Sequence, residues 1–95
     1  MLYILYCVDK PDSLDLRLAN REAHLNYAAG SLDMIKLAGP MFLDDGETMA
    51  GSMLIMEAET KAEIEAFSEG DPYRKAGLFQ TVDIRPFVQS LGTPH

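Results

Sequence analysis

The chain has little of several features that commonly point to a function. It holds one cysteine, two histidines and only eight basic residues against 15 acidic ones. A lone Cys7 cannot close a disulfide within the chain, so we expect a packing role for it and a reducing, cytoplasmic location. The net charge of -7 argues against nucleic acid and anionic membrane surfaces as partners. The apolar run at residues 2–8 is too short to span a bilayer and follows no basic segment, so we expect neither a membrane nor a targeting segment.

Motifs for metals and cofactors are also missing. The acidic cluster at residues 44–47 lacks the alternating ligand spacing of a calcium loop. His24, His95 and Cys7 show no zinc spacing. No glycine-rich phosphate loop and no nucleophile elbow is present. We therefore expect no metal and no organic cofactor.

The length of 95 residues predicts one domain, over residues 1–95. A chain of this size buries only about 60 to 65 % of the surface that its unfolded form exposes. Its stability margin is therefore thin, and oligomerisation is the usual supplement.

Hydrophobic periodicity predicts four strands and two helices. Short apolar or alternating runs indicate strands at residues 2–8, 34–38, 51–58 and 79–85, with Pro40 at an edge or a bulge. A helix over 13–29 is indicated by an apolar stripe at Leu14, Leu18, Leu25, Ala28 and Leu32. Thr60 and Glu63 form a capping box for a second helix that ends near Gly70. The order predicts an α+β, ferredoxin-like βαββαβ fold: a four-stranded antiparallel sheet with two helices on one face.

The first and third strands carry apolar side chains on both faces, although two helices cover only one. In the first strand, Tyr3 and Leu5 alternate with Ile4 and Tyr6. An uncovered apolar face is unusual on a soluble monomer. We therefore expect a homodimer in which the two sheets pack face to face.

Two polar positions stand out as candidates for chemistry. His24 lies beside the apolar stripe of the first helix, where Arg21 interrupts it, and imidazole can transfer a proton near neutral pH. Asp71 precedes Pro72, which restricts it to an extended conformation and fixes its side chain. The alternatives are a hydrogen-bonded boundary histidine, a turn-capping aspartate and arginines whose stems pack while their heads reach water.

Several segments together resemble the YCII-related (YciI-like) family: Arg21-x-x-His24-Leu25, Ala38-Gly39-Pro40, Asp45-Gly46, Gly51-Ser52, Asp71-Pro72-Tyr73, Gly77-Leu78 and Arg85-Pro86-Phe87. The resemblance covers nearly the whole chain. It implies a dimeric α/β barrel similar to muconolactone isomerase-like proteins, with His24 and Asp71 as the active-site pair. One branch of the family resembles a dehydrochlorinase that acts on a chlorinated hydroxyquinol.

The combined hypothesis is a cofactor-free lyase or isomerase that acts on a small cyclic or aromatic compound. His24 and Asp71 would be catalytic, with Arg21, Tyr73, Gly39 and Pro40 contacting the substrate. Two alternatives stay open. One is a non-catalytic ligand-binding or interaction module whose His24 and Asp71 form a structural pair, and the other, by fold analogy alone, is an oxygen-using monooxygenase.

Overall fold

The computed structural model describes residues 1–93 and has the predicted order of elements. In chain order they are β1 (Leu2–Asp9), α1 (Leu14–Ala29), β2 (Ile35–Phe42), β3 (Met49–Glu57), α2 (Lys61–Gly70), α3 (Pro72–Lys75) and β4 (Phe79–Phe87). The α+β, ferredoxin-like βαββαβ fold is therefore confirmed. The predicted domain extends to residue 95, and its last two residues lie outside the described part.

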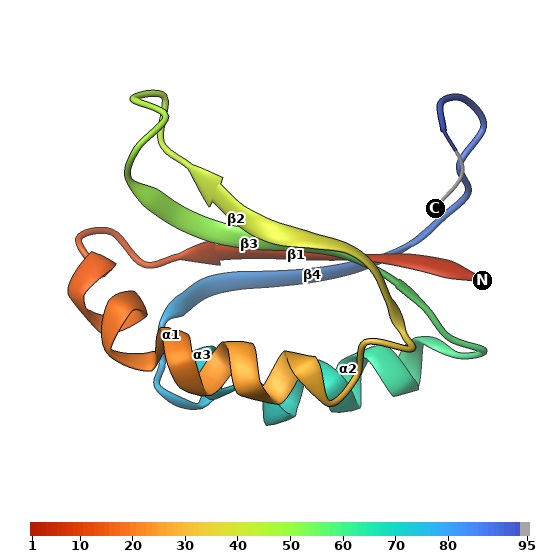
Figure 1. Cartoon of the computed structure of the whole chain (residues 1–95), viewed down its shortest axis with the longest axis horizontal. Helices are drawn as coiled ribbons and strands as arrows, with labels where there is room; N and C mark the ends of the chain where they lie inside the picture. Colours follow the sequence, from red (N-terminus) through yellow and green to blue (C-terminus); the bar gives the residue numbers. More distant parts are fainter. Residues whose placement is uncertain (94–95) are drawn as a thin grey trace.

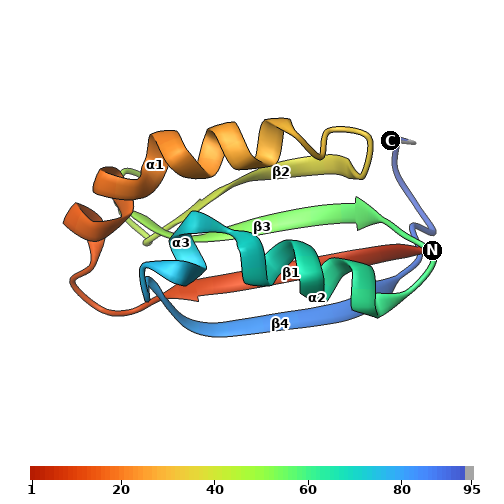
Figure 2. The ribbon, with the colours of Figure 1, turned by 90° about the horizontal axis from the view of Figure 1, so that it is seen from below.

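The four strands form one antiparallel sheet in the order β2-β3-β1-β4. The helices all lie on one face of this sheet (Figure 1). Seen from the helix side, α1 runs along the β2–β3 half, whereas α2 lies over β1 and β4 (Figure 2). The two halves of the same face are thus covered by different helices.

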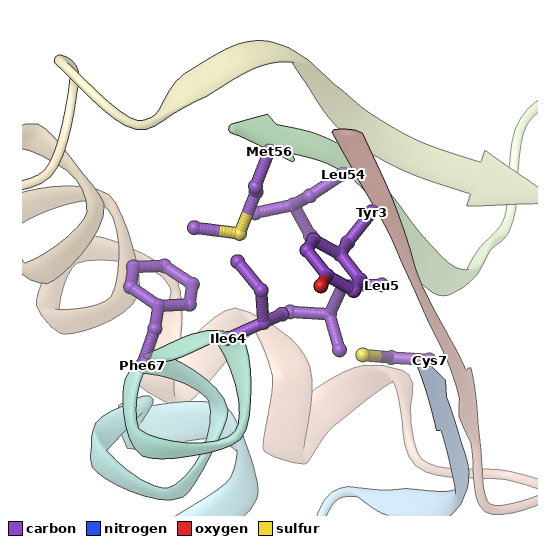
Figure 3. Packing of buried hydrophobic residues seen from close by; sticks show 7 residues of the cluster. All are labelled: Tyr3, Leu5, Cys7, Leu54, Met56, Ile64 and Phe67. Carbon is purple, nitrogen blue, oxygen red and sulfur yellow. The ribbon is translucent and has the colours of Figure 1, made fainter. Parts of the chain in front are cut away.

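The core lies under α2. Tyr3 pairs with Met56 and Leu5 with Leu54 across β1 and β3, and the pleat turns these side chains toward the helices. Ile64 and Phe67 of α2 pack onto them (Figure 3). The members of this cluster are Tyr3, Leu5, Cys7, Leu54, Met56, Ile64 and Phe67, each at most 7% exposed. Burial stabilises the fold by about 1.5 to 3 kcal/mol for each large apolar side chain.

Both strand prolines lie at the sheet edges. Pro40 is in β2 and Pro86 is in β4, the two outer strands. Proline cannot donate a ladder hydrogen bond, so these are the strands that tolerate it. The edge position predicted for Pro40 is confirmed. Both strands run past the ends predicted for them, because an edge proline does not stop a strand whose other side still pairs.

The segment after α2 was predicted to be irregular, but it forms the short helix α3. Asp71 has the extended conformation predicted from Pro72, with φ −64° and ψ 125°. Its side chain accepts a hydrogen bond from the backbone N–H of Tyr73, at 2.9 Å, as a helix N-cap does. Pro72 occupies the first turn, where its missing N–H costs nothing.

Helix α1 has nearly the predicted bounds, but the predicted orientation of its apolar stripe is wrong. Leu18 and Leu25 are each 50% exposed, whereas Arg17 is 2% exposed. With 3.6 residues in each turn, this places the buried side of the helix about a quarter of a turn from the leucines. The buried side carries polar side chains that find partners inside the fold.

The sheet face away from the helices is apolar and has no cover within residues 1–93. Tyr6 is 43% exposed, and Ile4, Met53 and Ile55 are partly exposed beside it. The homodimer inferred from these residues stays a prediction. None of the helices in the described range is long and apolar enough to cross a membrane.

Candidate active site

A cavity of about 260 Å³ separates α1 from β2 and β3. Its volume falls just below the range of about 300 to 1,000 Å³ that is usual for drug-sized ligands, so it suits a small molecule. One end is apolar and is lined by Leu25, Ala28, Ala29, Leu32, Ile35, Ala38 and Leu54. The other end is polar and is lined by Arg17, Arg21, His24, Ser52 and Tyr73.

His24 and Asp71 meet at the polar end. His24 Nδ1 lies 2.8 Å from Asp71 Oδ1, across 47 positions of sequence. The His24 side chain is 13% exposed and lines the cavity, whereas the Asp71 side chain is 4% exposed and lies behind it. The contact expected from the sequence is therefore present.

The geometry determines which histidine nitrogen faces the ligand. An aspartate carboxylate only accepts hydrogen bonds, so the proton of the neutral ring belongs on Nδ1 and is donated to Asp71. This leaves the lone pair of Nε2 available, and Asp71 also stabilises the ring once Nε2 is protonated. The same Oδ1 atom accepts from the Tyr73 N–H. Capping the turn and pairing with His24 were alternatives in the sequence, but here one oxygen contacts both the Tyr73 N–H and His24 Nδ1.

Tyr73 forms a wall between two residues of α1. Its ring stacks on the His24 ring with centroids 4.1 Å apart and planes 13° apart. The Arg17 guanidinium carbon lies 4.5 Å from the same Tyr73 centroid. Burial raises the pKa of Tyr73 above its usual value despite the nearby charge of Arg17, so its hydroxyl stays protonated at neutral pH.

Arg17 belongs to a buried cluster that the sequence analysis missed. Its Nε and Nη2 donate to the two carboxylate oxygens of Asp9, at 2.7 and 3.0 Å, and Nη2 also donates to Ser52 Oγ at 2.8 Å. Burial lowers the pKa of Arg17, but the hydrogen bond to Asp9 and its charge outweigh burial and raise the pKa overall. The guanidinium is therefore a permanent buried cation.

The alternative in which the arginine heads reach water is wrong for Arg17, whose guanidinium is inside the fold. The alternation of buried and exposed side chains along β1 could have indicated this cluster. Asp9 continues the series Tyr3, Leu5 and Cys7 on the helix-facing side of the strand. A carboxylate at a buried position requires a partner, and Arg17 shares the face of His24 two turns earlier on the helix.

The other predicted contact residues are at the cavity, although their roles stay predictions. Arg21 lines it from an exposed position on α1, next to the solvent. Gly39 and Pro40 line it from the edge strand β2, and Gly39 contributes backbone alone. Within residues 1–93 no three His, Cys, Asp or Glu side chains converge as metal ligands would. The arrangement can bind an oxygen-bearing molecule and move a proton at Nε2 of His24.

Comparison with known proteins agrees with the sequence motifs. The model of a family described as the YCII-related domain matches residues 1–88. The protein YciI of Escherichia coli O6:H1 (strain CFT073) is 38% identical over 94 residues, which cover 92% of this chain and 96% of that protein. A protein of Haemophilus influenzae (strain KW20) is 31% identical over 94 residues, with the same coverage of 92% and 96%.

One similar solved structure is an enzyme. It is the 5-chloro-2-hydroxyhydroquinone dehydrochlorinase of Burkholderia phenoliruptrix AC1100, in complex with 2,5-dihydroxybenzoquinone. Its chain is 38% identical to this one, with a TM-score of 0.87 and coverage of 95% of this chain and 96% of that one.

Proposed function

Because the chain belongs to the YCII-related domain family, we propose that it is a small-molecule enzyme of the lyase or isomerase type that uses His24 for acid–base chemistry. The observation that carries the proposal is the pair of His24 and Asp71 at the polar end of the cavity, 2.8 Å apart. A histidine on a cavity wall with a buried carboxylate behind it has the arrangement that proton transfer requires.

The proposed step is a proton abstraction. Nε2 of His24 takes a proton from a hydroxyl or a ring carbon of the substrate, and the electron pair left behind forms a new double bond. In a lyase, a leaving group departs with the pair of the bond that breaks, so that HX is lost in total. In an isomerase, the proton returns at another atom. Asp71 holds the imidazole in place and balances its transient positive charge.

The proposed substrate is a small ring that carries hydroxyl groups. The dehydrochlorinase of B. phenoliruptrix, similar over nearly its whole chain, acts on a chlorinated hydroxyhydroquinone and binds 2,5-dihydroxybenzoquinone. The cavity here has the size for one such ring, with apolar side chains at one end and donors at the other. A family tie does not name a substrate, so the cavity chemistry is the stronger guide.

The test is turnover of 5-chloro-2-hydroxyhydroquinone and related halogenated or hydroxylated rings, followed by halide release and by absorbance of the ring. We expect His24→Gln to lower kcat about 100-fold to 10,000-fold, the usual contribution of a general acid or base. Asp71→Asn keeps an oxygen for the Tyr73 N–H but loses the carboxylate, so it should also lower kcat. Asn26→Ala, exposed on the same helix, is the matched control.

If His24→Gln keeps kcat within about threefold of the unmodified protein, the proton-transfer role is wrong. The ligand-binding alternative is supported by the contacts of Tyr73, which stacks on His24 and is capped by Asp71. If the pair is structural, removing one partner should cost about 1 to 3 kcal/mol of unfolding free energy. Loss of stability in His24→Gln without loss of turnover would favour that alternative.

We also propose that the protein forms a homodimer through the sheet face away from the helices. Tyr6, Ile4, Met53 and Ile55 lie on that face. Sedimentation should give twice the mass of the chain, and Ile4→Lys should give monomers. A monomeric unmodified protein at micromolar concentration would refute the dimer.

A further inference from the structure

Two buried residues at the polar end of the cavity, Arg17 and Ser52, carry hydrogen-bond donors that Asp9 does not take up. The first donor is Nη1 of Arg17, since the hydrogen bonds of this guanidinium to Asp9 and Ser52 use Nε and Nη2. The Tyr73 side chain is the other polar neighbour of the guanidinium. None of the fully buried side-chain nitrogens and oxygens in the described range lacks a partner. Arg17 lines the cavity, and Nη1 is the guanidinium nitrogen that Asp9 and Ser52 do not engage.

The second donor is the hydroxyl of Ser52. Its Oγ accepts from Nη2 of Arg17 at 2.8 Å, which leaves its own hydrogen to be donated elsewhere. Ser52 is 5% exposed, lies on the helix-facing side of β3 and lines the cavity beside Arg17. Nη1 of Arg17, on α1, and the Ser52 hydroxyl, on β3, are thus two neighbouring donors at the polar end of the cavity.

We propose that Arg17 and Ser52 form a binding corner for an oxyanion, the ionised phenol or enol oxygen of a small ring. This inference rests on the proposed function and names the charged group of its substrate. Asp9 is a positioning residue: its two oxygens hold the guanidinium through Nε and Nη2, so that Nη1 needs no reorganisation when a ligand binds.

The corner also explains why the second arginine on the helix is not the main anion contact. Arg21 is exposed, and water screens the attraction of an exposed cation for an anion. Arg17 is 2% exposed and held by three hydrogen bonds, so its remaining donors act where water is excluded. Because Asp9 neutralises the charge of Arg17, recognition depends on the direction of the donors more than on net charge.

The arrangement selects a ligand with one ionised oxygen beside a position that exchanges a proton. His24 lies on the same helix face as Arg17, and the Tyr73 ring contacts both side chains. An oxygen held at the corner therefore keeps the ring near Nε2 of His24. The apolar end of the cavity then takes the unsubstituted edge of the ring.

The experiment is a calorimetric titration with two probes, 2,5-dihydroxybenzoquinone and its dimethyl ether, 2,5-dimethoxybenzoquinone, which cannot ionise. We expect the unmodified protein to bind the first probe more tightly. Ser52→Ala should weaken binding of 2,5-dihydroxybenzoquinone about tenfold to a hundredfold, the usual effect of losing a hydrogen bond to a charged group. It should change the affinity for the ether by less than about threefold, since no charge is bound there.

Ser68→Ala is the matched control. Ser68 is also buried and also accepts from an arginine at 2.8 Å, but that partner is Arg74 and the pair lies outside the cavity. Its affinities should equal those of the unmodified protein. Arg17→Lys is the second test variant, because lysine keeps a cation for Asp9 but has no second nitrogen to face the cavity. It should weaken 2,5-dihydroxybenzoquinone binding at least about tenfold.

Equal affinities of Ser52→Ala and Ser68→Ala for 2,5-dihydroxybenzoquinone would overturn the corner. Binding of neither probe by the unmodified protein would overturn the assigned ligand class. Thermal unfolding of each variant establishes that it is folded before titration. Failure of the proposed function is seen separately, as unchanged turnover in His24→Gln, because binding of these probes requires no proton transfer.

Discussion

Helix α2 buries apolar side chains against β1 and β3, whereas α1, over the other half of the same sheet, buries an arginine and part of a histidine. Ile64 and Phe67 of α2 are 0% and 5% exposed, but Leu25 of α1 is 50% exposed. The half under α2 is a close-packed core. The half under α1 holds a cavity with a hydrogen-bonded polar cluster at one end.

The contrast separates the part of the domain that provides stability from the part that holds the candidate site. A side chain that packs against a sheet gains free energy in proportion to the apolar area it buries, and α2 and its partners provide that term. A helix that stands off the sheet leaves room for a ligand. Its polar residues then need partners of their own, and Asp9, Ser52 and Asp71 provide them.

The largest effect on stability is expected from Arg17→Met, which leaves the Asp9 carboxylate buried without its partner. The variant should lose about 3 to 5 kcal/mol of unfolding free energy, measured by urea denaturation. The double variant Arg17→Met with Asp9→Asn removes both charges and should recover much of the loss. A loss below about 1 kcal/mol in the single variant would mean that the cluster is not buried as described.

The next largest effect on stability is expected from a side-chain deletion in α2, compared with the same kind of deletion in α1. Ile64→Ala should cost about 2 to 5 kcal/mol, because it opens a cavity in the core under α2. Leu25→Ala, the matched deletion on α1, should cost less than about 1 kcal/mol because that side chain is already half exposed. Equal losses in urea denaturation would contradict the division into a packed half and an open half.

A smaller effect is expected where the two helices are joined. The Tyr27 hydroxyl of α1 donates to the Phe67 carbonyl of α2 at 2.8 Å. Tyr27→Phe should therefore lose about 0.5 to 1.5 kcal/mol, the net value of one hydrogen bond. Tyr3→Phe, also in the core, is the control, because within residues 1–93 Tyr27 is the tyrosine whose hydroxyl makes such a hydrogen bond. This variant should lose close to nothing.

The smallest expected effect is a dependence of the unfolding free energy on pH, caused by the Cys7 thiol in the core under α2. Burial raises the pKa of the Cys7 thiol from 9.0 to about 12, with a further contribution from the charge of Asp71. The thiol ionises in the unfolded chain first, so its contribution to stability is complete below pH 9.0 and is lost as pH rises toward about 12.

Between pH 8 and pH 10, the unfolding free energy of the unmodified protein should fall by about 1 kcal/mol more than that of Cys7→Ala. The comparison with Cys7→Ala cancels the titration of the other groups. Unfolding free energies from urea denaturation at both pH values provide the check. A difference that stays constant between pH 8 and pH 10 would show that the thiol is solvated.

The sequence predicted the elements well because their signals are local. Alternation marked the strands, Thr60 with Glu63 marked the start of α2, and Pro72 correctly predicted the backbone of Asp71. The family resemblance is confirmed by the match over residues 1–88. The contact between His24 and Asp71 was expected and is present, whereas the cluster of Arg17, Asp9 and Ser52 was not expected; the roles of all these residues stay predictions.

Local patterning was enough to set which segments become strands or helices and in what order, since backbone preference and hydrophobic period act over a few residues. Packing over long range set which side of α1 faces inward. The leucines predicted the wrong side, because a stripe of apolar residues competes with the pairing of Arg17 and Asp9. A buried carboxylate without a partner costs more than a half-exposed leucine, so the pairing of Arg17 with Asp9 outweighs the apolar stripe in setting which side of α1 faces the sheet.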